Sequence, residues 1–169
     1  MSTITIGFSS PKAKFQLFAM AIQLVDHSKF SHAYIRFRSE SYDRDLVYQA
    51  SGMKVNFIGL PLFLDHVNIY KEFNIEVSEE TKQKVVQFAI DHVGLPYSLG
   101  AAIGILAVKA AALFGRKIKN PVSQRGYFCS ELAAIILKDY TGAALTDDDV
   151  KRMTPSDVYD FLEANYQAV

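Results

Sequence analysis

The sequence predicts an α+β fold in which a small antiparallel sheet packs against helices. Segments rich in β-branched and aromatic residues are grouped in the first half of the chain, whereas helical spacing of apolar residues dominates the second half. A polar stretch at 38–45 separates two of the strand-like segments and is typical of a hairpin loop. The 169 residues contain no repeat or linker, so we expect one domain over residues 1–169.

At the N-terminus we expect a short strand over residues 4–8, followed by a helix from about Pro11 to Asp26. Ser9 and Ser10 are suitable N-caps, and proline is favoured in a first helical turn. The apolar residues that repeat at helical spacing are Phe15, Phe18, Ala19, Ile22 and Val25.

Three further segments are predicted to form the rest of the sheet. They cover residues 31–37, residues 46–50 continuing through Gly52 to Phe57, and residues 67–75. Because hairpin-joined strands pair antiparallel, we expect an antiparallel sheet.

Four helices are expected after the strands. Ser78 begins a capping-box pattern that opens the first, which ends near Gly94. The second is the alanine-rich segment 99–114, the third begins at Cys129, and Thr154 precedes the last, which covers residues 158–166.

Segment 99–114 is the most hydrophobic part of the chain. It is shorter than the roughly 20 apolar residues that span a bilayer, and Lys109 interrupts it. We therefore expect a buried or half-buried helix. Contact with a membrane surface, aided by Arg116, Lys117 and Lys119, is the less favoured alternative.

Composition narrows the function classes. Eighteen basic and eighteen acidic residues cancel, which argues against nucleic acid as a partner. A single cysteine excludes an intramolecular disulfide, and the N-terminus has no basic segment followed by an apolar stretch, so we expect a cytoplasmic protein. Neither the spacing of Asp26, His27 and His32 nor the glycine pattern matches a metal or phosphate motif, so we expect no cofactor.

Cys129 and His32 are the residues that point to chemistry. Cys129 lies at the start of a helix, where free backbone N–H groups and the helix dipole favour the nucleophilic thiolate. Its alternative role is that of a small buried apolar residue. Of the four histidines, His32 begins an alternating strand and has the rigidity that a general base requires, whereas His27, His66 and His92 occupy turns or helix ends.

The segments Ser31-His32-Ala33-Tyr34-Ile35-Arg36 and Phe128-Cys129-Ser130-Glu131-Leu132 resemble the histidine strand and the cysteine helix of circularly permuted NlpC-type papain-like cysteine hydrolases. This is the YiiX-like group, related in fold to lecithin:retinol acyltransferase. In that branch the histidine strand precedes the cysteine helix, as it does here. Further similarity lies at Ile6-Gly7-Phe8-Ser9, Gly94-Leu95-Pro96-Tyr97 and Thr154-Pro155-Ser156-Asp157.

The resemblance implies a circularly permuted papain-like fold and a catalytic set of Cys129, His32 and Gln49. The family often has a carboxylate or a second histidine where this chain has Gln49, so the glutamine is a departure. Its amide oxygen can accept the imidazole N–H but stabilises imidazolium less than a charge does. The alternative is that Gln49 only fills an inward polar position. By the same resemblance, the Tyr97 hydroxyl could join the backbone N–H of Cys129 in the oxyanion site. Its alternative role is that of a core aromatic residue.

The sequence therefore predicts a thiol hydrolase that cleaves an amide or ester bond through an acyl-enzyme on Cys129. The resemblance allows a peptide, peptidoglycan or acyl-lipid substrate and a bacterial or phage origin. Two alternatives stay open: a catalytically silent papain-like binding or structural module, and a lipid-directed acyl hydrolase or acyltransferase.

Overall fold

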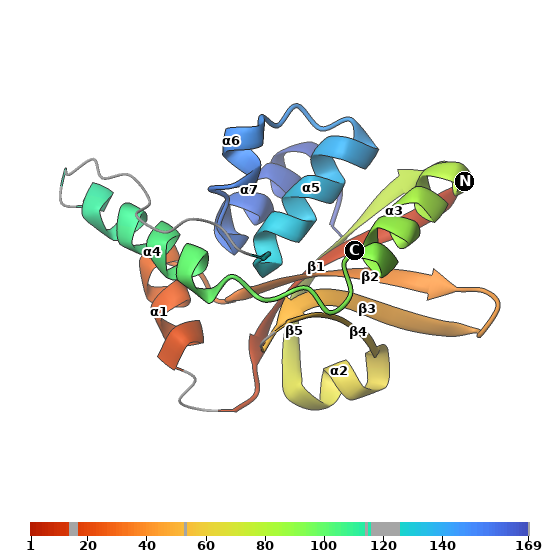
Figure 1. Cartoon of the computed structure of the whole chain (residues 1–169), viewed down its shortest axis with the longest axis horizontal. Helices are drawn as coiled ribbons and strands as arrows, with labels where there is room; N and C mark the ends of the chain where they lie inside the picture. The colour runs from red at the N-terminus through yellow and green to blue at the C-terminus, as the bar shows by residue number, and fades with distance from the viewer. Residues whose placement is uncertain (14–16, 53, 114, 116–125, 169) are drawn as a thin grey trace.

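The computed structural model describes residues 1–13, 17–52, 54–113, 115 and 126–168. At its centre is a five-stranded sheet with the strand order β4-β3-β2-β1-β5 (Figure 1). Every neighbouring pair of strands is antiparallel. The strands are β1 (Ser2–Pro11), β2 (His32–Ser39), β3 (Arg44–Ser51), β4 (Lys54–Gly59) and β5 (Val67–Val77). The expected α+β fold with an antiparallel sheet is confirmed.

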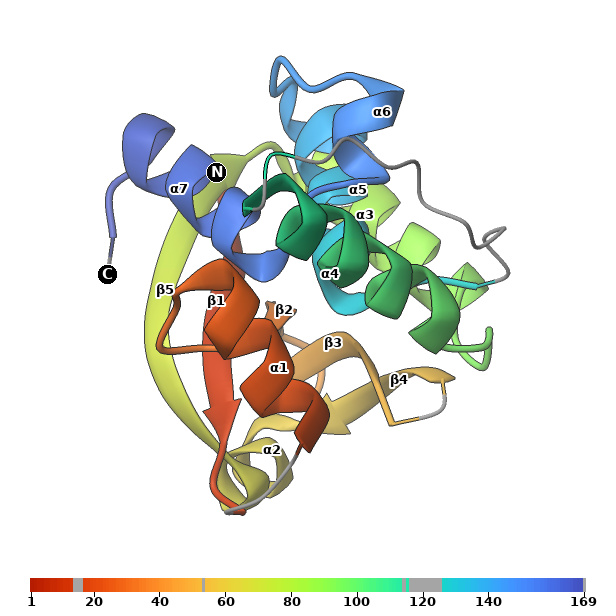
Figure 2. The ribbon, with the colours of Figure 1, turned by 90° about the vertical axis from the view of Figure 1, so that its left-hand side faces the viewer.

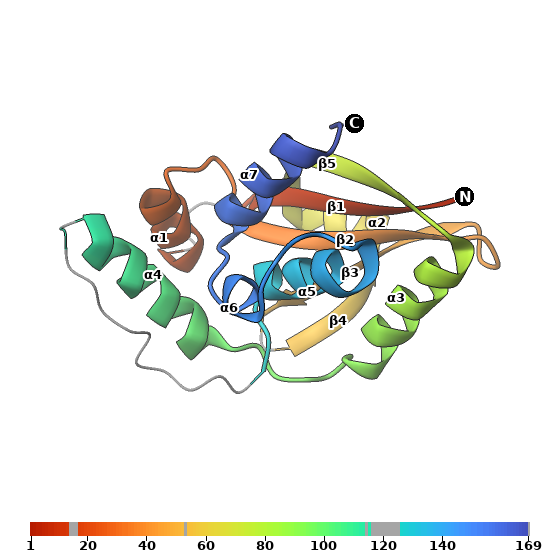
Figure 3. The ribbon, with the colours of Figure 1, turned by 90° about the horizontal axis from the view of Figure 1, so that it is seen from above.

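The described residues also form helices, most of them in the second half of the chain. They are α1 (Leu17–Asp26), α2 (Leu60–His66), α3 (Glu79–Asp91), α4 (Leu99–Leu113), α5 (Cys129–Thr141), α6 (Asp147–Val150) and α7 (Pro155–Asn165). Helices α3, α5 and α7 cover one face of the sheet, and α2 lies against the other (Figures 1 and 3).

The two faces have separate apolar cores because side chains alternate along each strand. Ala33 and Ile35 of β2 are fully buried in the larger core, which includes Leu132 of α5. Between them, Tyr34 points to the opposite face and packs on Phe63 of α2, with ring centroids 4.6 Å apart. The side chains of His32, Tyr34 and Arg36 therefore share the face that carries α2.

The prediction of a helix from Pro11 was wrong at its start. Ser9 and Ser10 continue β1 instead of capping a helix, and Pro11 pairs with Val67 of β5. The ten-residue β1 is stabilised by pairing with β5 along its whole length, and a proline at a strand end removes no essential ladder hydrogen bond. Helix α1 begins at Leu17; residues 14–16 of the expected helix lie outside the described part of the chain.

The segment expected to run from residue 46 through Gly52 to Phe57 is two strands, β3 and β4, which pair with each other. Gly52 has a φ of +70°, a conformation that suits glycine in a tight turn. Two short helices were not predicted. Helix α2, with Pro61 in its first turn, and the four-residue α6 are too short for a helical apolar repeat.

The other predicted helices are confirmed. Ser78 caps α3 by accepting the N–H of Thr81 at 3.0 Å, and Thr154 begins α7 in a reciprocal capping box with Asp157. Helix α4 is half-buried and lies beside α1 (Figure 2). Within the described ranges no helix is long and apolar enough to cross a bilayer. The basic residues Arg116, Lys117 and Lys119 lie outside those ranges.

Lys109, which interrupts the apolar sequence of α4, contacts the ends of two other helices, α1 and α7, through its ammonium group. The Nζ atom lies 3.2 Å from Asp26 at the end of α1 and 2.8 Å from Asp157 of α7, and it donates to Thr154 Oγ1 at 2.7 Å. The Asp26 side chain is fully buried whereas that of Lys109 is 30% exposed, so the carboxylate end of this ion pair is shielded from solvent. It fixes the position of α4 beside the pocket described below.

Candidate active site

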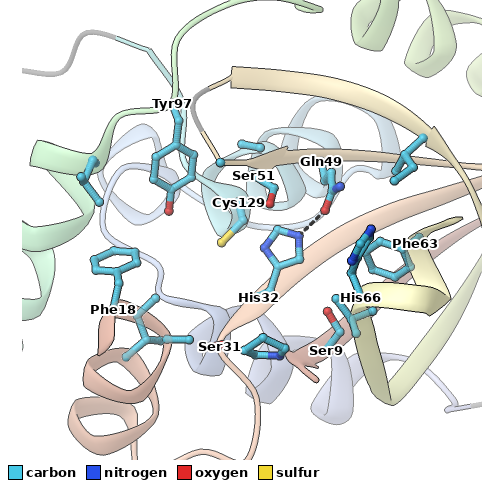
Figure 4. Close-up of a pocket in the computed structure, with 18 residues that line it drawn as sticks. Ser9, Phe18, Ser31, His32, Gln49, Ser51, Phe63, His66, Tyr97 and Cys129 are labelled. Carbon is cyan, nitrogen blue, oxygen red and sulfur yellow. Dashed lines mark hydrogen bonds between the residues drawn. The ribbon is translucent and has the colours of Figure 1, made fainter. Parts of the chain in front are cut away.

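The segment before α5 is held in place by a second backbone segment. Tyr127 N–H donates to the Pro96 carbonyl at 3.1 Å, and Ser98 N–H donates to the Tyr127 carbonyl at 2.9 Å. Tyr97 and Tyr127 thus form a short parallel bridge. Because α5 begins directly after this bridge, Tyr97 is brought to the side of Cys129 (Figure 4).

His32 is the first residue of β2, at the end of the sheet where α5 begins. The register that pairs Ile35 with Tyr48 makes Gln49 a diagonal neighbour of His32 on the same face. The His32 Nε2 and Gln49 Oε1 atoms are 2.7 Å apart. In Figure 4 the other ring nitrogen faces the sulfur of Cys129. The structure therefore brings the three residues together, with His32 between Cys129 and Gln49.

Asn56, the partner of Gln49 across the β3–β4 pair, determines which way the oxygen and nitrogen of the Gln49 amide point. Gln49 Nε2 donates to Asn56 Oδ1 at 3.4 Å, and Asn56 Nδ2 donates to the Lys54 carbonyl at 3.3 Å. The Gln49 oxygen is thereby directed at His32 and accepts its Nε2–H. In the neutral ring this leaves the lone pair of Nδ1 facing the thiol, as a general base requires. Asn56 was not identified in the sequence, where nothing marks its pairing with Gln49.

Desolvation shifts the pKa values of Cys129 and of the half-buried His32 in the directions that favour the thiol and the neutral imidazole. Cys129 is 4% exposed, and this burial raises the pKa of its thiol, although backbone groups of Ala33, Ser130 and Cys129 itself act in the opposite direction. Burial also lowers the pKa of His32 to about 4, against the opposing effect of the Gln49 hydrogen bond. The backbone groups at the helix start act toward the thiolate, as expected, but desolvation has the larger effect and the pKa of the thiol is raised.

Tyr97 completes the group around the sulfur. Its hydroxyl points toward Cys129 in Figure 4. Burial, with a smaller effect of Cys129, raises the pKa of Tyr97, so the phenol stays protonated and can donate a hydrogen bond. Glu131 accepts the N–H of Phe128 at 3.4 Å and serves the start of α5, as expected for a first-turn carboxylate.

Cys129, His32, Gln49 and Tyr97 line a pocket of about 450 Å³. Its apolar walls come from α1, α2 and α4, with Phe18, Ile22, Phe63 and Leu99 among them, and its polar groups include Ser9, Ser31 and His66. None of the described lining residues is Asp, Glu, Lys or Arg. A charged ligand group would thus meet no Asp, Glu, Lys or Arg side chain in this lining.

The remaining histidines lie apart from the sulfur. His92 ends α3, where its Nδ1 lies 2.7 Å from the Phe88 carbonyl oxygen, and His27 adopts a positive φ of 50° just after α1. His66 is the last residue of α2 and lines the pocket, although the sequence suggested only a polar turn. In the described part of the chain, no group of three or more His, Cys, Asp or Glu side chains is arranged to hold a metal ion.

Replacing Gln49 with glutamate is expected to raise the pKa of His32 from about 4 toward its ordinary value of about 6.5. The reason is that a carboxylate beside the ring stabilises imidazolium. An NMR titration of the imidazole C–H signals measures this, with the His32 signal identified by its loss in His32→Gln. Gln49→Leu is the control, because it removes the acceptor without adding charge and should leave the pKa low. A pKa that stays near 4 in Gln49→Glu contradicts the contact.

The comparisons with known proteins support the fold. No family model matches the chain, and a search of curated proteins finds no match. The crystal structure of the metalloprotein YiiX from Escherichia coli O157:H7, assigned to DUF1105, superposes with a TM-score of 0.68 at 20% sequence identity. The match covers 99% of this chain and 96% of that chain. The metal donor set that such a description implies is not assembled by the described residues here. The chain therefore has a YiiX-like α+β fold.

Proposed function

We propose that the protein is a thiol hydrolase that cleaves an amide or ester bond through an acyl-enzyme on Cys129. The observation that carries this proposal is the orientation of His32. Its Nε2 is fixed by Gln49 at 2.7 Å, and its other nitrogen faces the sulfur inside a pocket large enough for an acyl group. The YiiX-like fold and the order of histidine strand before cysteine helix support a circularly permuted papain-like relationship.

In the proposed reaction, His32 Nδ1 takes the thiol proton while the sulfur of Cys129 attacks the substrate carbonyl. The backbone N–H of Cys129 and the hydroxyl of Tyr97 stabilise the oxyanion that forms. His32 then gives its proton to the leaving amine or alcohol as the C–N or C–O bond breaks. Water, deprotonated by His32, attacks the thioester, and the thiol regains the proton from His32.

A neutral resting pair fits this sequence of proton transfers. The low pKa of His32 and the raised pKa of Cys129 mean that proton transfer accompanies attack instead of preceding it as a stable ion pair. Gln49 is consistent with this scheme, since a neutral amide orients the ring without holding it in the charged form.

The pocket favours an uncharged acyl group. Its walls are largely apolar and its described lining carries no charged residue, so carboxylates or ammonium groups such as those of peptidoglycan peptides would be desolvated without partners. A neutral acyl group, from a lipid or an uncharged peptide segment, fits this lining better.

Hydrolysis of two matched p-nitrophenyl esters tests this proposal. We expect p-nitrophenyl butyrate to be cleaved at least ~10-fold faster than p-nitrophenyl hemisuccinate, whose acyl chain ends in a carboxylate, because burying that charge costs more than ~1.4 kcal/mol. The hydrolysis rate measured with the Cys129→Ala variant at each ester concentration is subtracted as the background. Equal rates for the two esters would contradict a neutral acyl pocket, and rates equal to the Cys129→Ala background would contradict the hydrolase.

The burial of Cys129 favours a second candidate, a catalytically silent binding module. A neutral thiol that is only 4% exposed is the state of a structural cysteine. This candidate predicts saturable binding of a neutral acyl amide with no acyl transfer to Cys129. Detection of an acyl group on Cys129 by mass spectrometry separates the two.

A further inference from the structure

Ser9 occupies a place in the pocket that the proposed chemistry does not use. It lies in β1 directly opposite His32 in the β1–β2 register, so the two side chains share one face of the sheet. The register of β1 against β5 shifts between Phe8 and Ser9, which marks a bulge at this point. Bulges of this kind re-aim a side chain next to a site.

The hydroxyl of Ser9 is buried and, among the described residues, has no hydrogen-bond partner. The residue is 0% exposed, and its Oγ is one of two such side-chain atoms, the other being the Tyr48 hydroxyl. Tyr48 is not among the residues that line the pocket, whereas Ser9 is. A buried hydroxyl without a partner costs about 1–3 kcal/mol, so the Ser9 hydroxyl gains a hydrogen bond when a water or a ligand group binds beside it in the pocket.

The position of Ser9 relative to His32 indicates which part of a ligand it meets. In Figure 4 Ser9 and Tyr97 lie on opposite sides of His32, and the Ser9 hydroxyl points toward the space beside the ring and His66. Tyr97 lies beside the sulfur, where the acyl carbonyl would be held. When the scissile bond breaks, the leaving group takes its proton from His32 and continues past the imidazole, away from the acyl carbonyl. It would therefore occupy the space on the Ser9 side of His32.

We propose that Ser9 binds an uncharged hydrogen-bonding group, a hydroxyl or an amide, on the leaving-group side of the substrate. This assignment rests on the proposed function, because the leaving-group side is defined by proton donation from His32. The serine hydroxyl can donate to or accept from such a group. The absence of charged residues from the described lining selects a neutral amino alcohol, polyol or amide portion over an ionised one.

A pair of neutral amides of equal size tests the assignment by binding alone. N-(2-hydroxyethyl)butanamide and N-propylbutanamide differ only in a terminal hydroxyl or methyl group. We expect the native chain to bind the hydroxyethyl compound about 3- to 10-fold more tightly, the worth of one hydrogen bond, in an NMR chemical-shift titration. In Ser9→Ala this ratio should fall to about one through weaker binding of the hydroxyethyl amide, while binding of the propyl amide is unchanged.

Ser10→Ala is the matched control. Ser10 neighbours Ser9 on β1, points to the other face and is not among the pocket residues, so its replacement should preserve the native ratio. An unchanged ratio in Ser9→Ala, no preference in the native chain, or no binding of either amide in the pocket would each overturn the assignment.

Two further measurements separate this assignment from a purely structural role and from the hydrolase proposal. Ser9→Ala should unfold at the same temperature as the native chain or higher, because it removes a hydroxyl without a partner; a lower midpoint would show an internal partner and overturn the assignment. The amide titrations need no reactive thiol. If Cys129 fails to form an acyl-enzyme while Ser9 sets the binding ratio, the hydrolase proposal alone is contradicted, and the pocket still binds the neutral group.

Discussion

Replacing His32 with alanine is expected to slow acylation of Cys129 by p-nitrophenyl butyrate about 10²- to 10⁴-fold, the usual contribution of a positioned general base. The structure gives two reasons for an effect of this size. Burial raises the pKa of Cys129, so the thiol needs a base to react, and His32 has the nitrogen that faces the sulfur. The measurement is the early release of p-nitrophenol in a stopped-flow experiment, with Cys129→Ala, in which acylation should be absent, as the baseline.

The matched control is His27→Asn, which changes a histidine that is not among the pocket residues. Asparagine tolerates the positive φ of 50° at that position, so the fold should be kept and the acylation rate should stay at the native value. If His32→Ala acylates as fast as His27→Asn, His32 is not the base. Folding of each variant is checked by its unfolding midpoint.

Replacing Gly126 with alanine is expected to destabilise the protein by about 3 kcal/mol or more and to lower acylation in whatever fraction folds. The residue has a φ of +96°, and an added Cβ would clash with the backbone carbonyl oxygen of Pro96. Since that contact is with backbone, the two segments that place Tyr97 beside Cys129 must separate. Chemical denaturation measures the loss of free energy of unfolding.

Gly142→Ala isolates the cost of backbone conformation from that of the clash. Gly142 ends α5 with a φ of +74°, and nothing lies within 4 Å of an added Cβ. Its replacement should cost about 1 kcal/mol, and acylation should not change. Equal destabilisation by Gly126→Ala and Gly142→Ala would contradict the close approach at Pro96.

Local patterns were sufficient to predict the pieces of the site. The alternation that begins at His32 marks a strand, and the change from a loop to an apolar helical run marks the start of α5 at Cys129. Capping residues such as Ser78 and Thr154 predicted helix starts because capping depends only on neighbours within one turn.

Features set by long-range pairing could not be predicted in the same way. Ser9 and Pro11 carry local signals for a helix start, yet β5, some sixty residues later in the chain, pairs with them as strand. The hydrogen bond from Gln49 to Asn56 depends on the β3–β4 register, and the neutral state of Cys129 depends on burial by several elements. None of these has a periodic signature in the sequence.

The most direct test of the central claim is to locate the acyl group. The native chain is mixed with p-nitrophenyl butyrate, quenched in acid at early times and analysed by intact and peptide mass spectrometry. We predict one butyryl group, attached to Cys129, that forms in Gln49→Leu more slowly than in the native chain and decays as water releases it. A butyryl group on other residues only, or no adduct while N-(2-hydroxyethyl)butanamide still binds, would contradict the hydrolase and favour the silent binding module.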